Sequence, residues 1–179
     1  MENQIFKWHL IGFIFINIVG SLFHFVFEWS GYWPPIGAIS AVNESVWEHL
    51  KLVFWPLVFF SLIEYRFIKE EANNIIFGKE LAAYLMLFTI VAIFYTYEFI
   101  TGSHLFLVDI ASFVISIIVG QVVSYKILTA SQVPKIISVL SWISIIFLGF
   151  CFVLFTYFPP HLPIFMDSTN GTYGIAVST

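Results

Sequence analysis

Residues 136–158 read IISVLSWISIIFLGFCFVLFTYF and contain no charged side chain. A helix needs about 20 consecutive apolar residues to cross the hydrocarbon of a bilayer. Four further stretches reach that length, so the predicted spans are about 8–27, 46–68, 81–101, 105–126 and 136–158. Because these stretches lack the alternation of barrel strands, the sequence predicts an all-α integral membrane protein, a bundle of five transmembrane helices.

The composition favours the same class. Hydrophobic residues make up 60% of the 179 residues and charged residues only 10%, which is more apolar surface than a soluble domain can bury. We expect a single membrane domain over residues 1–179 in the cell membrane, with lipids as partners and with homo-oligomers or other membrane subunits as further possibilities. Cys151 is the only cysteine, which excludes an intramolecular disulfide. No basic patch alternates with aromatic residues, so nucleic acid is not an expected partner.

The positions of the cations predict an orientation. Six of them lie before the first span or in and beside the second and fourth connections: Lys7, Arg66, Lys69, Lys79, Lys126 and Lys135. The positive-inside rule then places the N-terminus in the cytoplasm and the C-terminus outside. Lys51 alone lies near an outer helix end, where we expect it to pair with Glu44 or Glu48, or with an anionic headgroup. The cytoplasmic carboxylates are interpreted as a solvated face: Glu64, Glu70, Glu71 and Glu80.

Two outer connections are long. Around residues 31–45, a short apolar patch is too short to span a membrane and too apolar for a free loop, which predicts a re-entrant or interfacial segment. The tail, residues 159–179, begins with the stiff pair Pro159-Pro160 and contains the turn signal Asn170-Gly171. Such a tail can fold back over the outer mouth of the bundle.

Every predicted span contributes ionisable or phenolic groups near its outer end. His24 and Glu28 share one helical face, and the start of the second span carries Glu44, Glu48 and His49. The remaining groups come from the other three spans and the tail: Tyr97, Glu98, His104, Asp109, Tyr157 and His161. Snorkelling and a capping box at Ser45 and Glu48 explain single residues without any function, but they do not explain the bias toward histidine. We therefore interpret the set as one shared polar site.

Imidazoles mixed with carboxylates suit Zn²⁺ or another divalent metal. The metal ligands expected from this pattern are His24, Glu28, His49, His104 and His161. Catalytic roles are assigned to Glu44, Glu48 and His49, and substrate contacts to Lys51, Tyr97, Glu98 and Asp109. Since no compact metalloenzyme motif is present, a histidine and carboxylate relay that moves protons without metal stays an alternative.

One resemblance covers almost the whole chain. Residues 24–30 (HFVFEWS), 40–51 (SAVNESVWEHLK), 159–165 (PPHLPIF) and 171–174 (GTYG) are similar to a family of small prokaryotic membrane proteins that is classed only as a domain of unknown function. That resemblance implies no activity. The site also resembles, more loosely, the membrane hydrolases of the alkaline ceramidase and progestin-receptor superfamily, which hold zinc through histidines. Those proteins have seven spans and a paired-histidine motif on the last span, where this chain has five predicted spans and the single His161.

Three functions remain open from the sequence. The first is a metal-dependent membrane hydrolase that acts on a lipid or small amphiphile, in which the metal activates water and a free carboxylate moves protons. The second is a solute-binding or transport subunit that receives a small molecule in the same outer polar cup. The third is a structural or assembly protein in which these groups only pair with one another.

Overall fold

The computed structural model describes residues 2–175, and these form six α-helices and two short 3₁₀ helices. The long helices are α1 (Glu2–Phe23), α3 (Val46–Ile68), α4 (Ile75–Thr101), α5 (Phe106–Leu128) and α6 (Lys135–Tyr157). The short elements are α2 (Val26–Trp29), η1 (Pro34–Ala38) and η2 (Pro163–Phe165). Among the described residues there is no strand, only an isolated bridge between Met166 and Tyr173.

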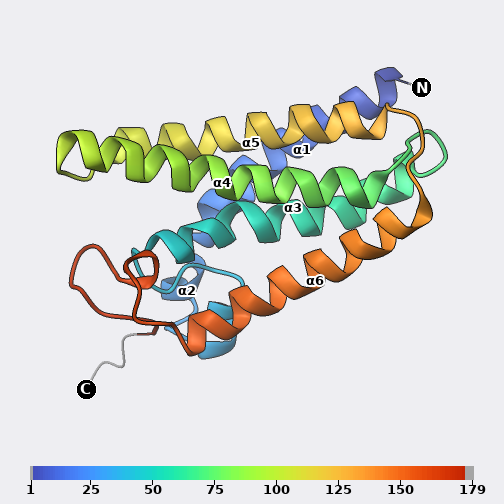
Figure 1. The fold of residues 1–179 in the computed structure, drawn as a ribbon. Coiled ribbons are helices and arrows are strands. Elements are labelled where there is room, and N and C mark those ends of the chain that lie inside the picture. Colours follow the sequence, from blue (N-terminus) through green and yellow to red (C-terminus); the bar gives the residue numbers. More distant parts are fainter. Residues whose placement is uncertain (1, 176–179) are drawn as a thin grey trace.

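Five helices are long and apolar enough to cross a membrane, as the sequence predicts. Figure 1 shows them as one bundle, in which α4 and α5 form an antiparallel hairpin and α6 crosses at an angle. Two bounds differ from the predicted spans. Helix α1 ends at Phe23 instead of near residue 27, because the chain turns at His24 and Phe25 before α2 begins. Helix α4 begins at Ile75, after Asn74 in the left-handed region with φ 53°.

Helix α3 is the central helix of the bundle. In its most apolar window 56% of the residues are buried inside the protein, against 17% for α6, so α6 offers most of its surface to lipid. The core around α3 combines residues from all five long helices, including Ile16, Phe54, Met86, Ile117 and Phe152. This core fixes the start of α3, which carries several of the predicted site residues.

Two glycines allow the long helices to approach closely. A Cβ on Gly20 of α1 would collide with the backbone carbonyl of Leu52 on α3, and one on Gly120 of α5 would collide with Met86 on α4. Small residues at such crossings are the usual means of close packing between membrane helices. The contact at Gly20 matters for the site, because α1 and α3 each lead to a predicted metal ligand.

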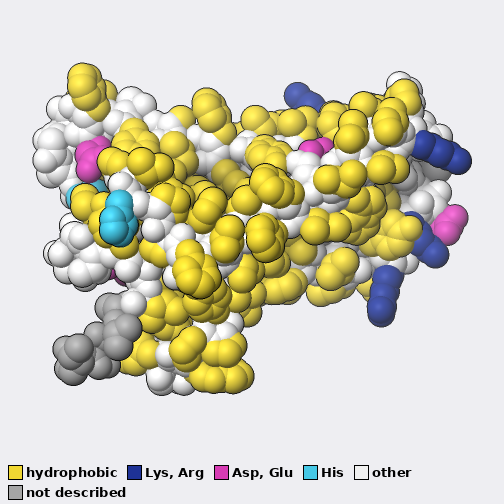
Figure 2. Space-filling view, turned by 60° about the horizontal axis from the view of Figure 1, so that its bottom comes forward, with side chains coloured by type: hydrophobic (Ala, Val, Ile, Leu, Met, Phe, Trp, Pro, Cys, Tyr) yellow, Lys and Arg dark blue, Asp and Glu magenta, His cyan; other side chains and the backbone are white. Residues whose placement is uncertain are grey.

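The two ends of the bundle differ in chemistry, as Figure 2 shows. We call one the basic end, defined by the exposed cations Lys7, Arg66, Lys69, Lys126 and Lys135. We call the other the histidine end, defined by His24, His49, His104 and His161. The chain starts at the basic end and reaches the histidine end with residues 159–175 (Figure 1). This segregation follows the sequence prediction, while the assignment of the basic end to the cytoplasm stays a prediction.

The interpretation of Glu64 as part of a solvated face is wrong. Its side chain has no exposed surface, and Oε2 lies 2.5 Å from Nζ of the buried Lys79. The other carboxylate oxygen lies 3.5 Å from Nδ1 of His9, and Nε2 of His9 lies 3.0 Å from the Ser124 hydroxyl. The rotation of α3 turns Glu64 into the bundle, so a residue near the basic end belongs to the interior.

The segment before α3 packs against the bundle instead of forming a free loop. It contains η1, where Gly37 is buried and its carbonyl accepts a hydrogen bond of 2.6 Å from Lys51 Nζ. The Ala41 amide also donates to the carbonyl of Phe23, the last residue of α1, over 3.3 Å. These contacts tie the approach to α3 to the end of α1. The depth of this segment in the membrane stays a prediction.

Candidate metal centre at the histidine end

Three side chains converge at the histidine end, each from a different kind of backbone. His24 follows the last residue of α1, Glu44 lies in the non-helical approach to α3, and His49 lies in the first turn of α3. Nε2 of His24 lies 3.2 Å from Nε2 of His49. Oε2 of Glu44 lies 3.6 Å from the first of these nitrogens and 3.4 Å from the second. We call these three residues the triad; they form a possible metal-holding cluster.

The spacing of the three atoms fits a small divalent metal. In a tetrahedral zinc site with bonds of about 2.0–2.1 Å, neighbouring ligand atoms lie about 3.3–3.4 Å apart. The sides of the triad, 3.2, 3.4 and 3.6 Å, bracket that spacing. Three protein ligands also leave one position for water or substrate, which is the pattern of catalytic zinc sites.

The orientation of His49 favours a role as a ligand. Its Nδ1 lies 2.8 Å from the carbonyl oxygen of Ser45, which can only accept a hydrogen bond, so Nδ1 carries the proton. Nε2 of the neutral ring is then free to bind a cation, which is the usual arrangement around metal-bound histidine. The Ser45 hydroxyl accepts from the Glu48 amide and caps α3, so the same residue starts the helix and orients the ligand.

Glu44 is suited to hold positive charge. The neighbouring His24 and His49 imidazoles hold the pKa of its carboxyl well below the usual range, more strongly than its partial burial raises it. The side chains of the triad remain 32–44% exposed. A metal ion and a water molecule can therefore reach them directly from the solvent.

The C-terminal segment holds the backbone around Glu44. The Asp167 carboxylate accepts a hydrogen bond from the Glu44 amide, and the Ser168 hydroxyl donates to the Glu44 carbonyl. Burial by itself would raise the pKa of Asp167. The hydrogen bonds from Thr169 and from the Glu44 amide together outweigh this effect, so the pKa lies below the usual range. Sequence reasoning did not select Asp167 or Ser168 as site residues. The similarity of the tail to the family motif was the available signal.

Glu48 precedes His49 in the sequence, but its carboxylate has other partners than the triad. Its carboxylate is 2% exposed, and Oε2 lies 2.5 Å from Nζ of Lys51, which has no exposed surface. Oε1 accepts a hydrogen bond from the Thr156 hydroxyl, and Oε2 accepts one from the Val42 amide. Lys51 thus pairs with a carboxylate, as expected from its position. The pair links α3 to α6 and to the segment that carries η1.

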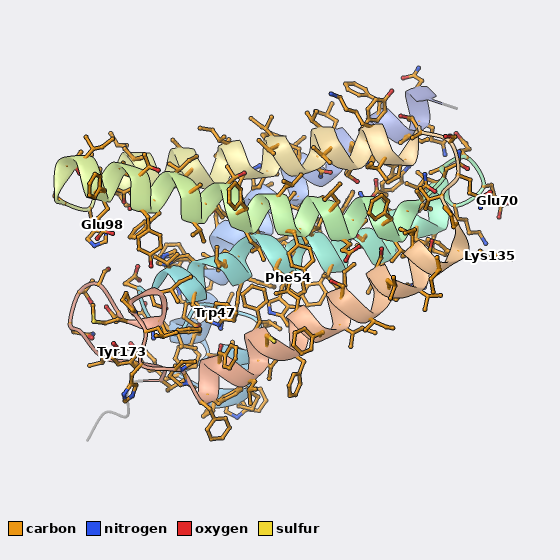
Figure 3. The ribbon with its side chains drawn as sticks, in the orientation of Figure 1. Trp47, Phe54, Glu70, Glu98, Lys135 and Tyr173 are labelled. Carbon is orange, nitrogen blue, oxygen red and sulfur yellow. The ribbon has the colours of Figure 1, made fainter. Side chains whose placement is uncertain are left out.

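The other predicted site residues lie outside the triad. Glu28 is exposed, and the rings of His161 and Tyr173 lie with centroids 4.7 Å apart. His104 lies 3.4 Å from Glu98, near the end of α4 that Figure 3 labels. The Tyr97 hydroxyl donates a hydrogen bond to Asp109, which lies in the first turn of α5. Of the five predicted metal ligands, the triad thus contains His24 and His49, with Glu44 as the third member.

Comparison with known proteins identifies the family but no activity. A model of the Family of unknown function DUF6512 matches residues 1–175, so the chain belongs to that family. No curated protein and no solved structure matches the chain.

Proposed function

We propose that this member of the family binds a divalent metal ion, best zinc, through His24, Glu44 and His49, and uses it to activate water at the outer membrane surface. The observation that carries the proposal is the spacing of the three ligand atoms, 3.2–3.6 Å, in a cluster open to solvent. A metal bound by three protein groups retains a position for water and lowers the pKa of that water to about 7. This chemistry suits hydrolysis of an ester or amide.

The proton from that water requires an acceptor. Both oxygens of Glu48 are already engaged inside the protein, so its contacts favour a positioning role over the general-base role expected from the sequence. Asp109 is a better acceptor, because its carboxylate lies in the first turn of α5, only partly buried and outside the triad. The hydroxyl of Tyr97 donates to Asp109 and orients it. We assign Asp109 as the proton acceptor in the proposed reaction.

The charge pattern favours a neutral or cationic amphiphile as substrate. Among the residues that the structure describes, the five exposed Lys and Arg side chains all lie at the basic end, and Lys51 is buried in its ion pair. The histidine end carries carboxylates instead. These carboxylates would repel an anionic headgroup everywhere except at the metal itself. The end of α4 exposes the large apolar side chains of Phe99 and Ile100, which offer apolar surface for a hydrocarbon chain.

Metal analysis of the purified protein tests the binding step. After zinc loading and dialysis we expect about one ion per chain, with affinity reduced on the order of 10²-fold or more in His24→Ala and His49→Ala, because each loses a ligand. His104→Ala and His161→Ala are matched controls, since both histidines lie at the same end but outside the triad. Equal zinc content and affinity in all four variants would reject the site.

Turnover then separates catalysis from simple binding. Zinc-loaded protein is mixed with neutral and cationic ester and amide amphiphiles, and product is measured by mass spectrometry. We expect Asp109→Asn to keep zinc while turnover falls by about 10²-fold or more, the usual loss for a positioned base. Zinc binding without product from any of these compounds would favour the solute-binding alternative, in which the metal captures its ligand without changing it.

A further inference from the structure

We propose that residues 159–175, here called the C-terminal clamp, set the position of Glu44 in the metal site, with Asp167 as the positioning residue. This inference rests on the proposed metal site and goes beyond it by naming what controls the affinity of that site. The clamp fixes Glu44, whereas His49 lies in α3 and His24 directly follows α1.

Both backbone polar groups of Glu44 are held by the clamp. The Glu44 amide donates to Oδ2 of Asp167 over 3.3 Å, and the Ser168 hydroxyl donates to the Glu44 carbonyl over 3.2 Å. Asp167 is only 4% exposed, so its carboxylate is part of the interior and not a chance surface contact. These partners are more than 120 residues apart in the chain, so the fold and not local sequence brings them together.

The clamp is itself held in a defined shape. Oδ1 of Asp167 accepts hydrogen bonds from the amide and the hydroxyl of Thr169, at 2.8 and 2.6 Å. The Asp167 amide donates to the Thr172 carbonyl, and the Gly171 amide donates back to the Asp167 carbonyl, at 2.8 and 2.9 Å. Asp167 therefore closes its own loop and presents its second oxygen to Glu44.

Two further contacts anchor the clamp beside Glu44. The Phe165 ring packs on Trp47 in the first turn of α3, with centroids 4.8 Å apart. Figure 3 shows Trp47 at this junction and Tyr173 on the clamp. Asn43 donates from Nδ2 to the Gly174 carbonyl over 2.9 Å, while its Oδ1 accepts from the Ser45 amide. The clamp thus contacts residues 43, 44 and 47, on both sides of the metal ligand.

The need for such a clamp follows from the backbone of the ligands. His49 is fixed by α3 and His24 by the end of α1, but Glu44 precedes the N-cap of α3 and has no helical hydrogen bonds. Metal bonds tolerate errors of only about 0.2 Å, so a loose approach to α3 would lose affinity. By thermodynamic linkage, a clamp that favours metal binding must in turn be stabilised by the metal to the same degree.

Two measurements test this inference: the zinc affinity of the protein and the protection of the clamp amides from hydrogen exchange. We expect Asp167→Asn and Ser168→Ala to weaken zinc binding by about 10-fold or more, within the range known for residues that orient metal ligands. The visible spectrum of the cobalt-substituted protein should also change, because the geometry at the metal changes. Thr172→Ala is the matched control, since it removes a hydroxyl contact to Asn170 in the same loop without touching Glu44.

Amide hydrogen exchange is the second measurement. If the clamp only stabilised the fold, zinc would not change the exchange rates of its amides. Zinc should slow amide exchange in residues 159–175 of the wild type and of Thr172→Ala, but not of Glu44→Ala. If the wild type binds no zinc, the metal site fails and the clamp proposal fails with it. If the wild type binds zinc and both Asp167→Asn and Ser168→Ala match its affinity and spectrum, the metal site stands and the clamp is rejected. Should Asp167→Asn not fold, Ser168→Ala decides alone, because it removes one exposed hydroxyl and no charge.

Discussion

At the scale of single residues, two neighbouring glutamates have opposite environments. Glu44 is 44% exposed and faces two imidazoles, whereas Glu48 is 2% exposed and faces an ammonium group. The contacts therefore favour a ligand role for the first and a positioning role for the second. Residue type and spacing in the sequence do not separate these roles, because a spacing of four would place both carboxylates on one face of a continuous helix, whereas α3 begins only at Val46.

A substitution at Glu48 tests whether this residue is a buried counter-ion or a general base. Glu48→Gln leaves the Lys51 ammonium buried without its counter-charge, so we expect a loss of about 3–5 kcal/mol in the free energy of unfolding. A general base would instead lower turnover and leave stability unchanged. The double variant Glu48→Gln/Lys51→Met should recover much of the loss. Denaturation in detergent measures both, and wild-type stability in the single variant would contradict the buried-pair account.

At the scale of elements, α1 and α3 bring the two imidazoles together. Their close approach depends on Gly20, whose missing side chain leaves room for the Leu52 carbonyl. His24 follows the end of α1, and His49 lies at the start of α3. A change in the separation of these helices therefore changes the distance between the two nitrogens.

Two glycine variants test this dependence. We expect Gly20→Ala to lower the free energy of unfolding by about 1–3 kcal/mol, the usual cost of overpacking, and to weaken zinc binding as α1 shifts. Gly149→Ala is the control, because a Cβ there meets only ordinary contacts, the nearest at 3.4 Å. Thermal unfolding and zinc titration of both variants are the measurements. Equal behaviour of the two would show that the α1–α3 contact does not set the site.

The helices were the predictable part of the structure, and the rotation of each helix was not. Hydropathy predicts the spans and which end a residue is near, so His24, Glu44 and His49 were all among the candidates. In a membrane, however, lipid-facing and bundle-facing positions are both apolar, and the pattern does not show which way a polar residue turns. This is why Glu64 was wrongly placed in solvent. The same limit applies to Glu28 and His104, which the sequence groups with His24 and His49 but which are not part of the cluster that the structure forms.

At the scale of the whole molecule, the protein is a bundle with chemically different ends. Exposed cations mark one end and histidines mark the other (Figure 2). The candidate metal centre and its clamp lie at the histidine end. The two buried ion pairs lie toward opposite ends of α3: Glu48 pairs with Lys51 within α3, and Glu64 of α3 pairs with Lys79 of α4. If the basic end faces the cytoplasm, the metal centre faces outside, where its substrate would arrive from the outer leaflet or the external solvent.

Reporter fusions test this orientation. A reporter that works only in the cytoplasm should be active when it is inserted near Asn73, in the connection between α3 and α4. A reporter that works only outside the cytoplasm should be active when it is fused after Thr179, beyond the described residues. We expect this result because the cations surround the first position and are missing around the second. The reverse result would place the metal centre in the cytoplasm.

X-ray absorption at the zinc edge tests the central claim most directly. For the wild-type protein loaded with one equivalent of zinc, the account predicts four or five light ligands at about 2.0–2.1 Å, with the outer-shell scattering of two imidazoles. In His49→Ala the imidazole signal should fall to that of one ring, with zinc bound more weakly. A spectrum without imidazole scattering, or one unchanged in His49→Ala, would contradict a metal centre at His24, Glu44 and His49.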